Sequence, residues 1–405
     1  MDQHLVRSMA TPASDILVSV YARTDIGRRR SGNEDAFLIA DLTSGNVGLG
    51  PEMMTHPVGE QGSLLIVSDG MGGAAAGEIA SEIAVKTIRD SLQEIPADLD
   101  TPARLRIATE LANECIWTEA QHNPELEGMG ATVTAVLVQG AIAYIAQVGD
   151  SRAYLIRGER IKQVTKDQSY AQALSDSGIF SPEQIANVPQ NVLLQALGTQ
   201  PVVQVGLTAV DLLRNDFLVV CSDGLSGKIE PDELCDVVGQ SPDLTSACRR
   251  LVDTANERGG EDNITVIVAL FDGVGLDAAD ESTSITGSFK SLSKDYRPDQ
   301  SVGDTQPLGS LPSTDQASRT VMMPSLASPK KAPETTLPAT AESSGAPQRA
   351  ETADASVARQ KYKTVVLRRD KAEKKIVNTR WLILFLLFLL ILSEVGYAIY
   401  TLASR

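Results

Sequence analysis

The sequence predicts a mixed α+β domain in which strands pack face to face. Three observations predict it. Apolar runs, either alternating or continuous, recur between residues 16 and 271. Helical patterns come in pairs, two after the early strands and two before the last strand. Hydrophobic residues make up 42% of the 405 residues and aromatic residues only 4%, which indicates a large aliphatic core.

The spacing of apolar residues places each element. Pro231 and Pro242 lie where the last two helices start. The expected helices are Glu78–Leu92, Pro102–Gln121, Asp232–Val238 and Leu244–Glu257. The expected strands are Ile16–Ala22, Ala36–Ala40, Leu64–Ser68, Thr132–Val138, Ile142–Val148, Ala153–Arg157, Val202–Leu207, Phe217–Ser222 and Ile264–Phe271.

Composition divides the chain into four parts. Residues 14–272 carry the strand and helix patterns and form the globular domain. Residues 273–358 are rich in Ser, Thr, Ala and Pro and have no apolar period, so they cannot bury enough surface to offset their chain entropy. We expect a disordered linker there. A basic segment, 359–380, and an apolar segment, 381–402, follow.

The apolar segment, WLILFLLFLLILSEVGYAIYTL, predicts a transmembrane helix. Twenty-two helical residues span about 33 Å, against about 30 Å for the hydrocarbon core of a bilayer. Nine Lys and Arg residues between Arg359 and Arg380 precede it, and Arg405 follows it. The positive-inside rule then predicts a single-pass protein of the cytoplasmic membrane with its globular domain in the cytoplasm. A buried core helix is the alternative, and Glu394 either meets a partner helix or reaches the interface.

Charge and cysteine usage exclude several classes of protein. The chain has 52 acidic and 36 basic residues, and its net charge of -16 repels phosphate backbones, so no nucleic-acid partner is expected. The N-terminus has no apolar stretch, so no signal peptide is expected. No disulfide scaffold or thiolate zinc site is expected from four cysteines without a C-x-x-C pair, which are Cys115, Cys221, Cys235 and Cys248.

Five aspartates fall at strand ends. Asp69 and Asp223 each follow an apolar strand within the tripeptide Ser-Asp-Gly. Asp150 closes a strand, whereas Asp35 and Asp262 each open one. Any one of them is readily explained as a turn residue. If the strand ends coincide, however, the five like charges cannot all stay ionised without cations, and all-oxygen ligation suits Mg²⁺ or Mn²⁺.

Six ordered sequence blocks carry a family resemblance. The chain resembles the metal-dependent Ser/Thr protein phosphatases of the type 2C (PPM) family, bacterial branch. That resemblance implies an α+β fold with a central antiparallel β-sandwich flanked by helix pairs, a four-layer α/β/β/α arrangement. The blocks are TDIGRRRSGNED (24–35), DGMGGAAAGE (69–78), GAT (130–132), VGDSR (148–152), CSDGL (221–225) and GEDNITV (260–266).

The resemblance also implies metal ligands. Asp69 would bridge two ions, and Gly70 would offer its backbone carbonyl to one of them. Asp223 and Asp262 would complete the other ion, and Asp150 would join Asp223 at a third, weaker site. The cofactor implied is Mn²⁺ or Mg²⁺, with two core ions.

Four further residues are implied around the ions. Asp35 would ligate directly or hold water on a metal, with Glu34 beside it, and Asn263 would support the ligands. Arg30 would hold the substrate phosphate, because a planar guanidinium binds two phosphate oxygens at once. Arg30 and Asp69 are therefore the expected catalytic residues.

The function implied is hydrolysis of phosphoserine and phosphothreonine on proteins, opposing a Ser/Thr kinase. Two ions about 3.5–4 Å apart lower the pKa of a shared water, which becomes the nucleophile. A silent phosphoprotein-binding module and a two-metal phosphodiesterase or nuclease are the alternatives. The intact set of metal aspartates argues against the first alternative, and the acidic domain argues against the second.

Three departures from the family pattern stand out. Ala74 and Gln168 replace histidines that many bacterial relatives carry, and we expect altered rate or substrate handling rather than inactivity. The connection Asp41–Gly62 is long, and we interpret it as a disordered insertion rather than an accessory surface. Residues 166–192 fall where the family carries a mobile flap, and contact of this segment with substrate protein is a hypothesis.

Overall fold

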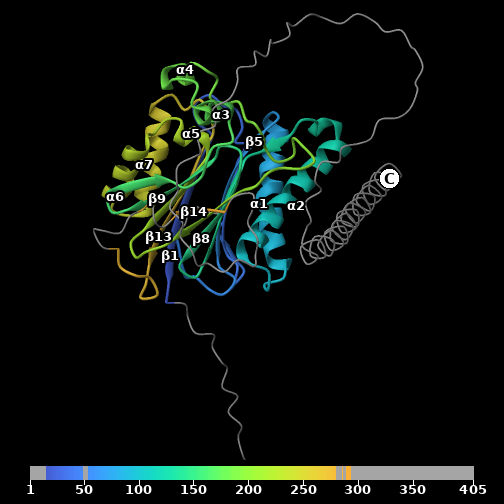
Figure 1. Cartoon of the computed structure of the whole chain (residues 1–405). Helices are drawn as coiled ribbons and strands as arrows, with labels where there is room; N and C mark the ends of the chain where they lie inside the picture. Colours follow the sequence, from blue (N-terminus) through green and yellow to red (C-terminus); the bar gives the residue numbers. More distant parts are fainter. Residues whose placement is uncertain (1–14, 49–52, 280–284, 286–288, 293–405) are drawn as a thin grey trace, which may run out of the picture.

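The structure is a computed structural model that describes residues 15–48, 53–279, 285 and 289–292 (Figure 1). Within this part of the chain, no helix has both the length and the apolar composition needed to cross a bilayer. The predicted basic segment 359–380 and membrane helix 381–402 lie outside the described residues, as does nearly all of the predicted linker.

Two antiparallel sheets form the centre of the molecule (Figure 1). The first sheet contains, in spatial order, β10 (Arg160–Gln163), β9 (Arg152–Arg157), β12 (Phe217–Cys221), β13 (Ile264–Asp272), β1 (Leu17–Asp25) and β4 (Met54–Pro57). The second contains β14 (Phe289–Ser291), β11 (Gly206–Asp211), β8 (Ile142–Val148), β7 (Val133–Gln139), β5 (Ser63–Met71), β2 (Asp35–Asp41) and β3 (Asn46–Gly48), with β6 (Gly130–Ala131) paired to β5.

Helices cover the outer faces of both sheets, which confirms the predicted mixture of antiparallel sheets and helices. The helices α1 and α2 pack on the second sheet, whereas α6 and α7 pack on the first. The described helices are α1 (Ala74–Glu94), α2 (Thr101–His122), η1 (Pro124–Leu126), α3 (Tyr170–Ser177), α4 (Pro182–Ala186), α5 (Asp223–Ser226), α6 (Pro231–Gln240) and α7 (Leu244–Glu257).

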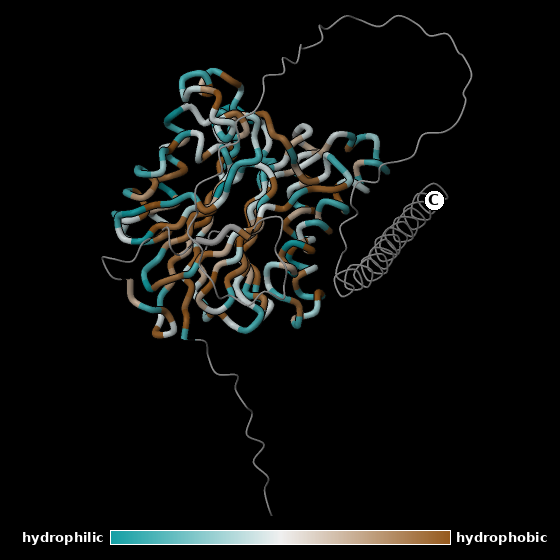
Figure 2. The backbone as a smooth tube through the Cα atoms, viewed as in Figure 1, coloured by the Kyte–Doolittle hydropathy of each residue, from teal (hydrophilic) through white to brown (hydrophobic). Residues whose placement is uncertain are grey.

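Burial on both sheet faces explains the continuous apolar runs in the sequence. In β5, Leu64 and Ile66 pack among the residues beneath α1 and α2, whereas Leu65 and Val67 pack between the two sheets. All four side chains are fully buried. A third cluster joins the first sheet to α6 and α7. In Figure 2 the hydrophobic colour is accordingly concentrated in the central strands.

The strand expected at Val202–Leu207 begins later in the structure, and β11 spans Gly206–Asp211. Val202 is exposed, and the carbonyl of Gln204 accepts hydrogen bonds from the side chains of Gln168 and Gln195. Side-chain contacts thus hold this stretch in place of a strand ladder. Alternation of apolar residues alone does not distinguish the two cases.

The connection after Asp41 is not the unstructured insertion that its length indicated. Residues 46–48 form β3, which extends the second sheet beside β2, and residues 54–57 form β4 beside β1. Residues 49–52 between them are not described. Each strand is short and lies at a sheet edge, so neither carries the apolar alternation that marks a longer strand.

Beyond Asp272, where we expected the linker to begin, the described residues still pack on the domain. Leu276 is 2% exposed and Ile285 is 9% exposed, and both belong to the cluster between the sheets. Residues 289–291 then form β14 against β11. Isolated apolar residues at these spacings give no periodic signal, so the sequence did not predict the contact.

A buried ion pair yields a prediction about stability. Arg157 and Asp216 are 2% and 0% exposed, and the guanidinium donates two hydrogen bonds of 2.8 and 2.6 Å to the carboxylate. We expect Asp216→Asn to lower the free energy of unfolding by about 3–5 kcal/mol, because it leaves a buried charge uncompensated. Urea unfolding measures this loss. The control is Glu233→Gln, which breaks an exposed pair with Arg258 and should leave the unfolding free energy nearly unchanged.

Candidate active site

The sheet register brings the predicted aspartates to one end of the sandwich. Asp35, at the start of β2, lies directly opposite Asp69 near the end of β5. Asp223 opens α5 just after β12, and the hydroxyl of Ser222 before it donates a 2.8 Å hydrogen bond to Asp35. Asp150 follows β8, the strand beside β7 in the same sheet. Residues far apart in the sequence therefore converge.

The carboxylates are held where their charges oppose one another. Burial raises the pKa of Asp69 well above its usual value, and the charges of Asp35 and Asp223 raise it further. Burial also raises the pKa of Asp35 to about 7. Burial, followed by the charge of Asp223, raises the pKa of Asp150 to about 7. The pKa of Asp223 is raised by burial and then by the charge of Asp262. A cation would relieve this repulsion.

Two oxygen atoms in the cluster lack a hydrogen-bond partner. They are Oδ1 of Asp35 and Oδ1 of Asp223, and both are buried. Unpaired buried carboxylate oxygens are costly unless they ligate a metal. The donor set is all oxygen, which suits a hard divalent cation. On this observation the residues present fit Mn²⁺ or Mg²⁺.

The carboxylate of Asp262 accepts two hydrogen bonds from neighbouring groups. Its Oδ2 accepts a 2.8 Å hydrogen bond from Arg30, and its Oδ1 accepts one from its neighbour's backbone, the N–H of Asn263. Among the described residues, no three carboxylate, imidazole or thiol groups form a cluster that could hold a metal ion in this arrangement. The contact with Arg30 therefore occupies Oδ2 of Asp262 in this arrangement.

Arg30 lies beside the acidic cluster and contacts two carboxylates there. Its guanidinium bridges Asp262 and Glu34, at 2.8 and 3.7 Å, and its side chain is 46% exposed. The hydrogen bond to Asp262 raises the pKa of Arg30. Burial raises the pKa of Glu34, whereas the charge of Arg30 lowers it. An exposed cation held only by carboxylates is free to exchange them for a phosphate.

Asn263 fixes the loop that carries Arg30. Its side-chain oxygen accepts a 2.8 Å hydrogen bond from the backbone N–H of Glu34. Its amide nitrogen donates to the carbonyls of Ile26 and Gly32, at 2.9 and 3.0 Å. One side chain at the start of β13 therefore positions both ends of the loop.

Gly70 lies where the chain turns from β5 toward α1. A Cβ on this residue would lie 2.0 Å from the carbonyl oxygen of Gly77 and 2.7 Å from that of Glu34. Gly73, the N-cap of α1, has a φ of 95°, a conformation that favours glycine. The sequence Gly-Met-Gly-Gly therefore allows the first turn of α1 to lie against the acidic cluster.

We expect Gly70→Ala to lower the free energy of unfolding by about 1–3 kcal/mol, because the backbone must shift to admit the methyl group. Activity should fall with it, since the shift displaces Asp69. The matched control is Gly239→Ala in α6, where an added Cβ meets open space. Thermal unfolding of both variants measures the difference, and equal stabilities would contradict the account.

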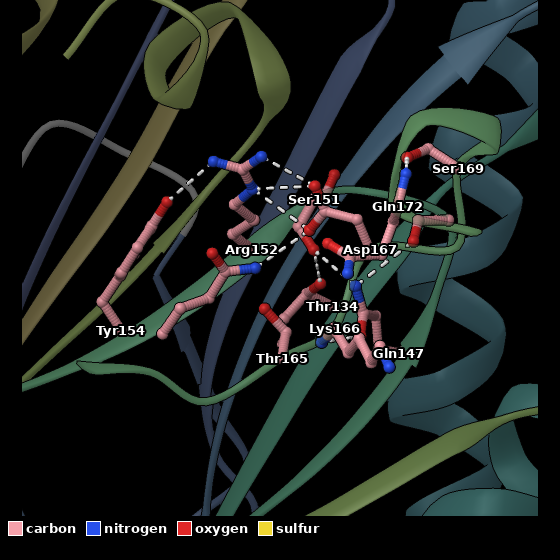
Figure 3. A network of polar contacts seen from close by, with 12 residues as sticks. Thr134, Gln147, Ser151, Arg152, Tyr154, Thr165, Lys166, Asp167, Ser169 and Gln172 are labelled. Carbon is pink, nitrogen blue, oxygen red and sulfur yellow. Dashed lines mark hydrogen bonds and ion pairs between the residues drawn. The ribbon is translucent and has the colours of Figure 1, made fainter. Parts of the chain in front are cut away.

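Three side chains link the predicted flap to the site, and the sequence analysis did not predict their contacts. Figure 3 shows Arg152 facing Asp167, and its guanidinium binds the carboxylate at 2.7 and 3.0 Å. Gln168, which replaces the family's histidine, accepts a 2.9 Å hydrogen bond from the backbone N–H of Gly149 through its side-chain oxygen. The base of the flap is thereby tied to the loop that carries Asp150.

The segment 166–192 contains two helices, α3 and α4, that lie over this end of the molecule (Figure 1). A cavity of about 300 Å³ lies beneath them. Asp150 and Asp223 line it, as do Gln172 and Ser175 of α3. A substrate segment that enters the cavity therefore touches both the flap and the acidic cluster.

The fold and the site define a class of protein, an antiparallel sandwich with carboxylates gathered at one end. A family model described as "Protein phosphatase 2C" matches residues 54–269, more than half of the chain. The chain belongs to the protein phosphatase 2C family. The resemblance inferred from the six blocks is confirmed, and so is the predicted enzyme class at the level of the family.

Two curated relatives and one solved structure illustrate the similarity. The chain is 34% identical over 248 residues to "Serine/threonine protein phosphatase PstP" of Mycobacterium tuberculosis, a match that covers 61% of this chain and 44% of that protein. It is 36% identical over 250 residues to "Serine/threonine phosphatase stp" of Listeria welshimeri, covering 61% of this chain and 93% of the relative.

The catalytic domain of PstP has been solved "in complex with 2 Manganese ions". That structure is 32% identical to this chain with a TM-score of 0.53, and the match covers 64% of this chain and 99% of the other. The prediction of two Mn²⁺ or Mg²⁺ ions is thus confirmed for the family. The chain spans less than half the length of PstP, so its own substrates and partners are a matter for proposal.

Proposed function

We propose that this chain is a metal-dependent phosphatase that hydrolyses phosphoserine and phosphothreonine on proteins. One observation carries the proposal, which is the convergence of Asp35, Asp69, Asp150 and Asp223 on one sandwich end beside Arg30. The names of the relatives support it, since both are serine/threonine phosphatases.

We also propose that the scaffold has the four layers α/β/β/α that the resemblance implied. Three hydrophobic clusters support this, one between the sheets and one between each sheet and its helices. Sheets that are buried on both faces hold their strand ends rigidly. The carboxylates are then positioned before any ion binds, which lowers the cost of forming the site.

The proposed metal ligands are those that the family resemblance implies. Asp69 and the carbonyl of Gly70 would hold one ion, and Asp69 would hold a second together with Asp223 and Asp262. Asp35 lies opposite Asp69, with Glu34 beside it. When bound, two such ions lower the pKa of water and neutralise charge on the transferring phosphoryl group.

Asp150 and Asp223 are the proposed ligands of the third, weaker ion. They line the same cavity beneath the flap.

Arg30 is proposed to bind the substrate phosphate and to gate Asp262. Its exposed guanidinium matches two phosphate oxygens as well as it matches a carboxylate. Oδ2 of Asp262 now accepts a hydrogen bond from Arg30, and it would become available to a cation if the guanidinium bound the phosphate instead. Asn263 holds the loop in register while this exchange occurs.

We further propose that residues 381–402 tether the domain to the cytoplasmic membrane, with the domain in the cytoplasm and a Ser/Thr kinase as its counterpart. The support is the sequence alone, an apolar segment preceded by nine basic residues. The full-length chain should stay in the membrane fraction after an alkaline wash, and deletion of residues 381–402 should release it. Release of both forms would reject the tether.

The function is tested with a phosphothreonine peptide and the full-length chain. Phosphate release should require Mn²⁺, should stop with EDTA and should be absent in Asp69→Asn. Binding of the peptide without phosphate release would instead indicate a silent recognition module. Release from a phosphodiester but not from the peptide would indicate a phosphodiesterase.

A further inference from the structure

The chain returns to the active-site end of the sandwich after its last long strand. β13 starts at Ile264, beside the acidic cluster, and ends at Asp272, at the opposite pole. There the side chain of Arg214 holds the turn, donating hydrogen bonds of 3.1 Å to the carbonyls of Gly273 and Leu276. Without a further strand, the chain would leave the domain far from the active site.

β14 carries the chain back along the edge of the second sheet. It runs antiparallel to β11, with Phe289 opposite Val210 and Ser291 opposite Thr208. The N–H of Leu292 then donates a 2.9 Å hydrogen bond to the carbonyl of Leu207. Residue numbers in β14 therefore increase toward the N-terminal end of β11.

That end of β11 is the active-site end. Gly206 pairs with Gln147 of β8, and β8 continues directly to Asp150. Four strand spacings separate β14 from β5, which carries Asp69. At 4.7–4.9 Å each, they place Leu292 about 19 Å from β5 across the sheet, level with Ile66, three residues before Asp69.

The sequence beyond Leu292 is rich in phosphorylatable side chains. Residues 293–358, outside the described part of the chain, contain 17 Ser and Thr residues. A phosphoryl group on this segment is covalently linked to the domain that carries the acidic cluster, so its effective concentration at that site does not fall when the protein is diluted.

We propose that the chain removes phosphoryl groups from its own segment 293–358 in cis. The inference rests on the proposed function. Water adds to phosphorus, the bond from phosphorus to the Ser or Thr oxygen breaks, and that oxygen takes up a proton released by the water while inorganic phosphate leaves. The phosphorylation state of the segment is then set by a competition between a kinase and the attached domain.

The length of chain between Leu292 and each Ser or Thr predicts which phosphoryl groups are removed fastest. Thr305 follows Leu292 by 13 residues, and Thr352 follows it by 60. A flexible coil of 13 residues has an r.m.s. span of roughly 20 Å, and one of 60 residues has a span of roughly 43 Å. The first matches the distance to the site, and effective concentration falls as about the −3/2 power of length beyond the match. Thr305 should therefore be hydrolysed about tenfold faster than Thr352.

The experiment uses full-length chains carrying phosphothreonine at position 305 or 352, with hydrolysis started by Mn²⁺. The rate constant at Thr305 should not change over about a hundredfold range of protein concentration, as expected for an intramolecular reaction. Free phosphopeptides with the same two sequences correct for intrinsic preference. Rates that rise in proportion to protein concentration, or equal corrected rates at the two positions, would overturn the inference.

Detaching β14 tests the role of the strand. Lys290 pairs with Ala209 and lies two residues before Leu292, whose N–H donates a hydrogen bond to β11. Because donors alternate along an antiparallel strand, the N–H of Lys290 also faces β11. Lys290→Pro removes this donor, and the tether then starts from the far pole. The rate at Thr305 should fall several-fold while free-peptide hydrolysis stays constant, and Lys290→Ala should change neither.

The free peptides separate the two claims. If they are hydrolysed but the rate at Thr305 rises in proportion to protein concentration, the cis inference fails and the proposed function stands. An unchanged rate at Thr305 in Lys290→Pro would reject the role of β14. If neither the peptides nor the chain-borne phosphothreonine are hydrolysed, the proposed function fails and the inference with it.

Discussion

Asp69→Asn is expected to reduce phosphatase activity by about a thousandfold or more, a loss of about 4 kcal/mol in transition-state stabilisation. Asp69 lies opposite Asp35, and its pKa is raised by burial and then by four neighbouring carboxylates. It is the residue on which the proposed ions converge. An amide has nearly the same shape but cannot supply the negative charge that a bridging ligand needs.

The same substitution should stabilise the metal-free protein. Because the fold raises the pKa of Asp69, the ionised carboxylate destabilises the native state at neutral pH. Asn removes this charge, so the Tm in EDTA at pH 8 should rise. The matched control is Asp253→Asn on α7, an exposed carboxylate that should change neither activity nor Tm. Loss of activity together with a lower Tm would assign Asp69 a structural role instead.

Metal removal should expose a pH dependence of stability with a definite sign. The pKa values of Asp35 and Asp150 are raised to about 7, first by burial. A raised carboxyl pKa means that the unfolded state releases its proton more readily than the native state. The stabilisation is complete below about pH 4 and is lost as the pH rises toward about 7.

In EDTA, the Tm should therefore be higher at pH 5 than at pH 8, by about 5 °C or more for a domain of this size. Mn²⁺ at pH 8 should restore the lost stability, because it neutralises the ionised cluster and binds only the native state. Phosphatase activity should disappear with EDTA and return with Mn²⁺. A Tm that is independent of pH in EDTA would show that the carboxylates do not repel one another.

Much of the site could be predicted because its residues lie at the ends of strongly apolar strands. The runs at β5 and β12 are unmistakable, and the repeated Ser-Asp-Gly after them marked Asp69 and Asp223. Ser222, which donates to Asp35, belongs to the same tripeptide and could have been found from the repeat. Local sequence sufficed because the strand fixes where its end points.

The parts that escaped prediction depend on pairing between distant segments. The edge strands β3, β4 and β14 gain their structure from neighbours, and their own sequences are too short to show a period. The contact of Arg30 with Asp262 joins residues 232 positions apart, and no spacing rule reports it. The pair of Arg152 and Asp167 likewise depends on how the flap folds back on β9.

Diffraction from crystals grown with Mn²⁺, recorded at the manganese absorption edge, tests the central claim most directly. The account predicts two anomalous peaks at the sandwich end, with Asp69 between them, Asp223 and Asp262 on one ion, and Arg30 withdrawn from Asp262. Peaks elsewhere, or Asp69, Asp223 and Asp262 without a shared ion, would contradict it.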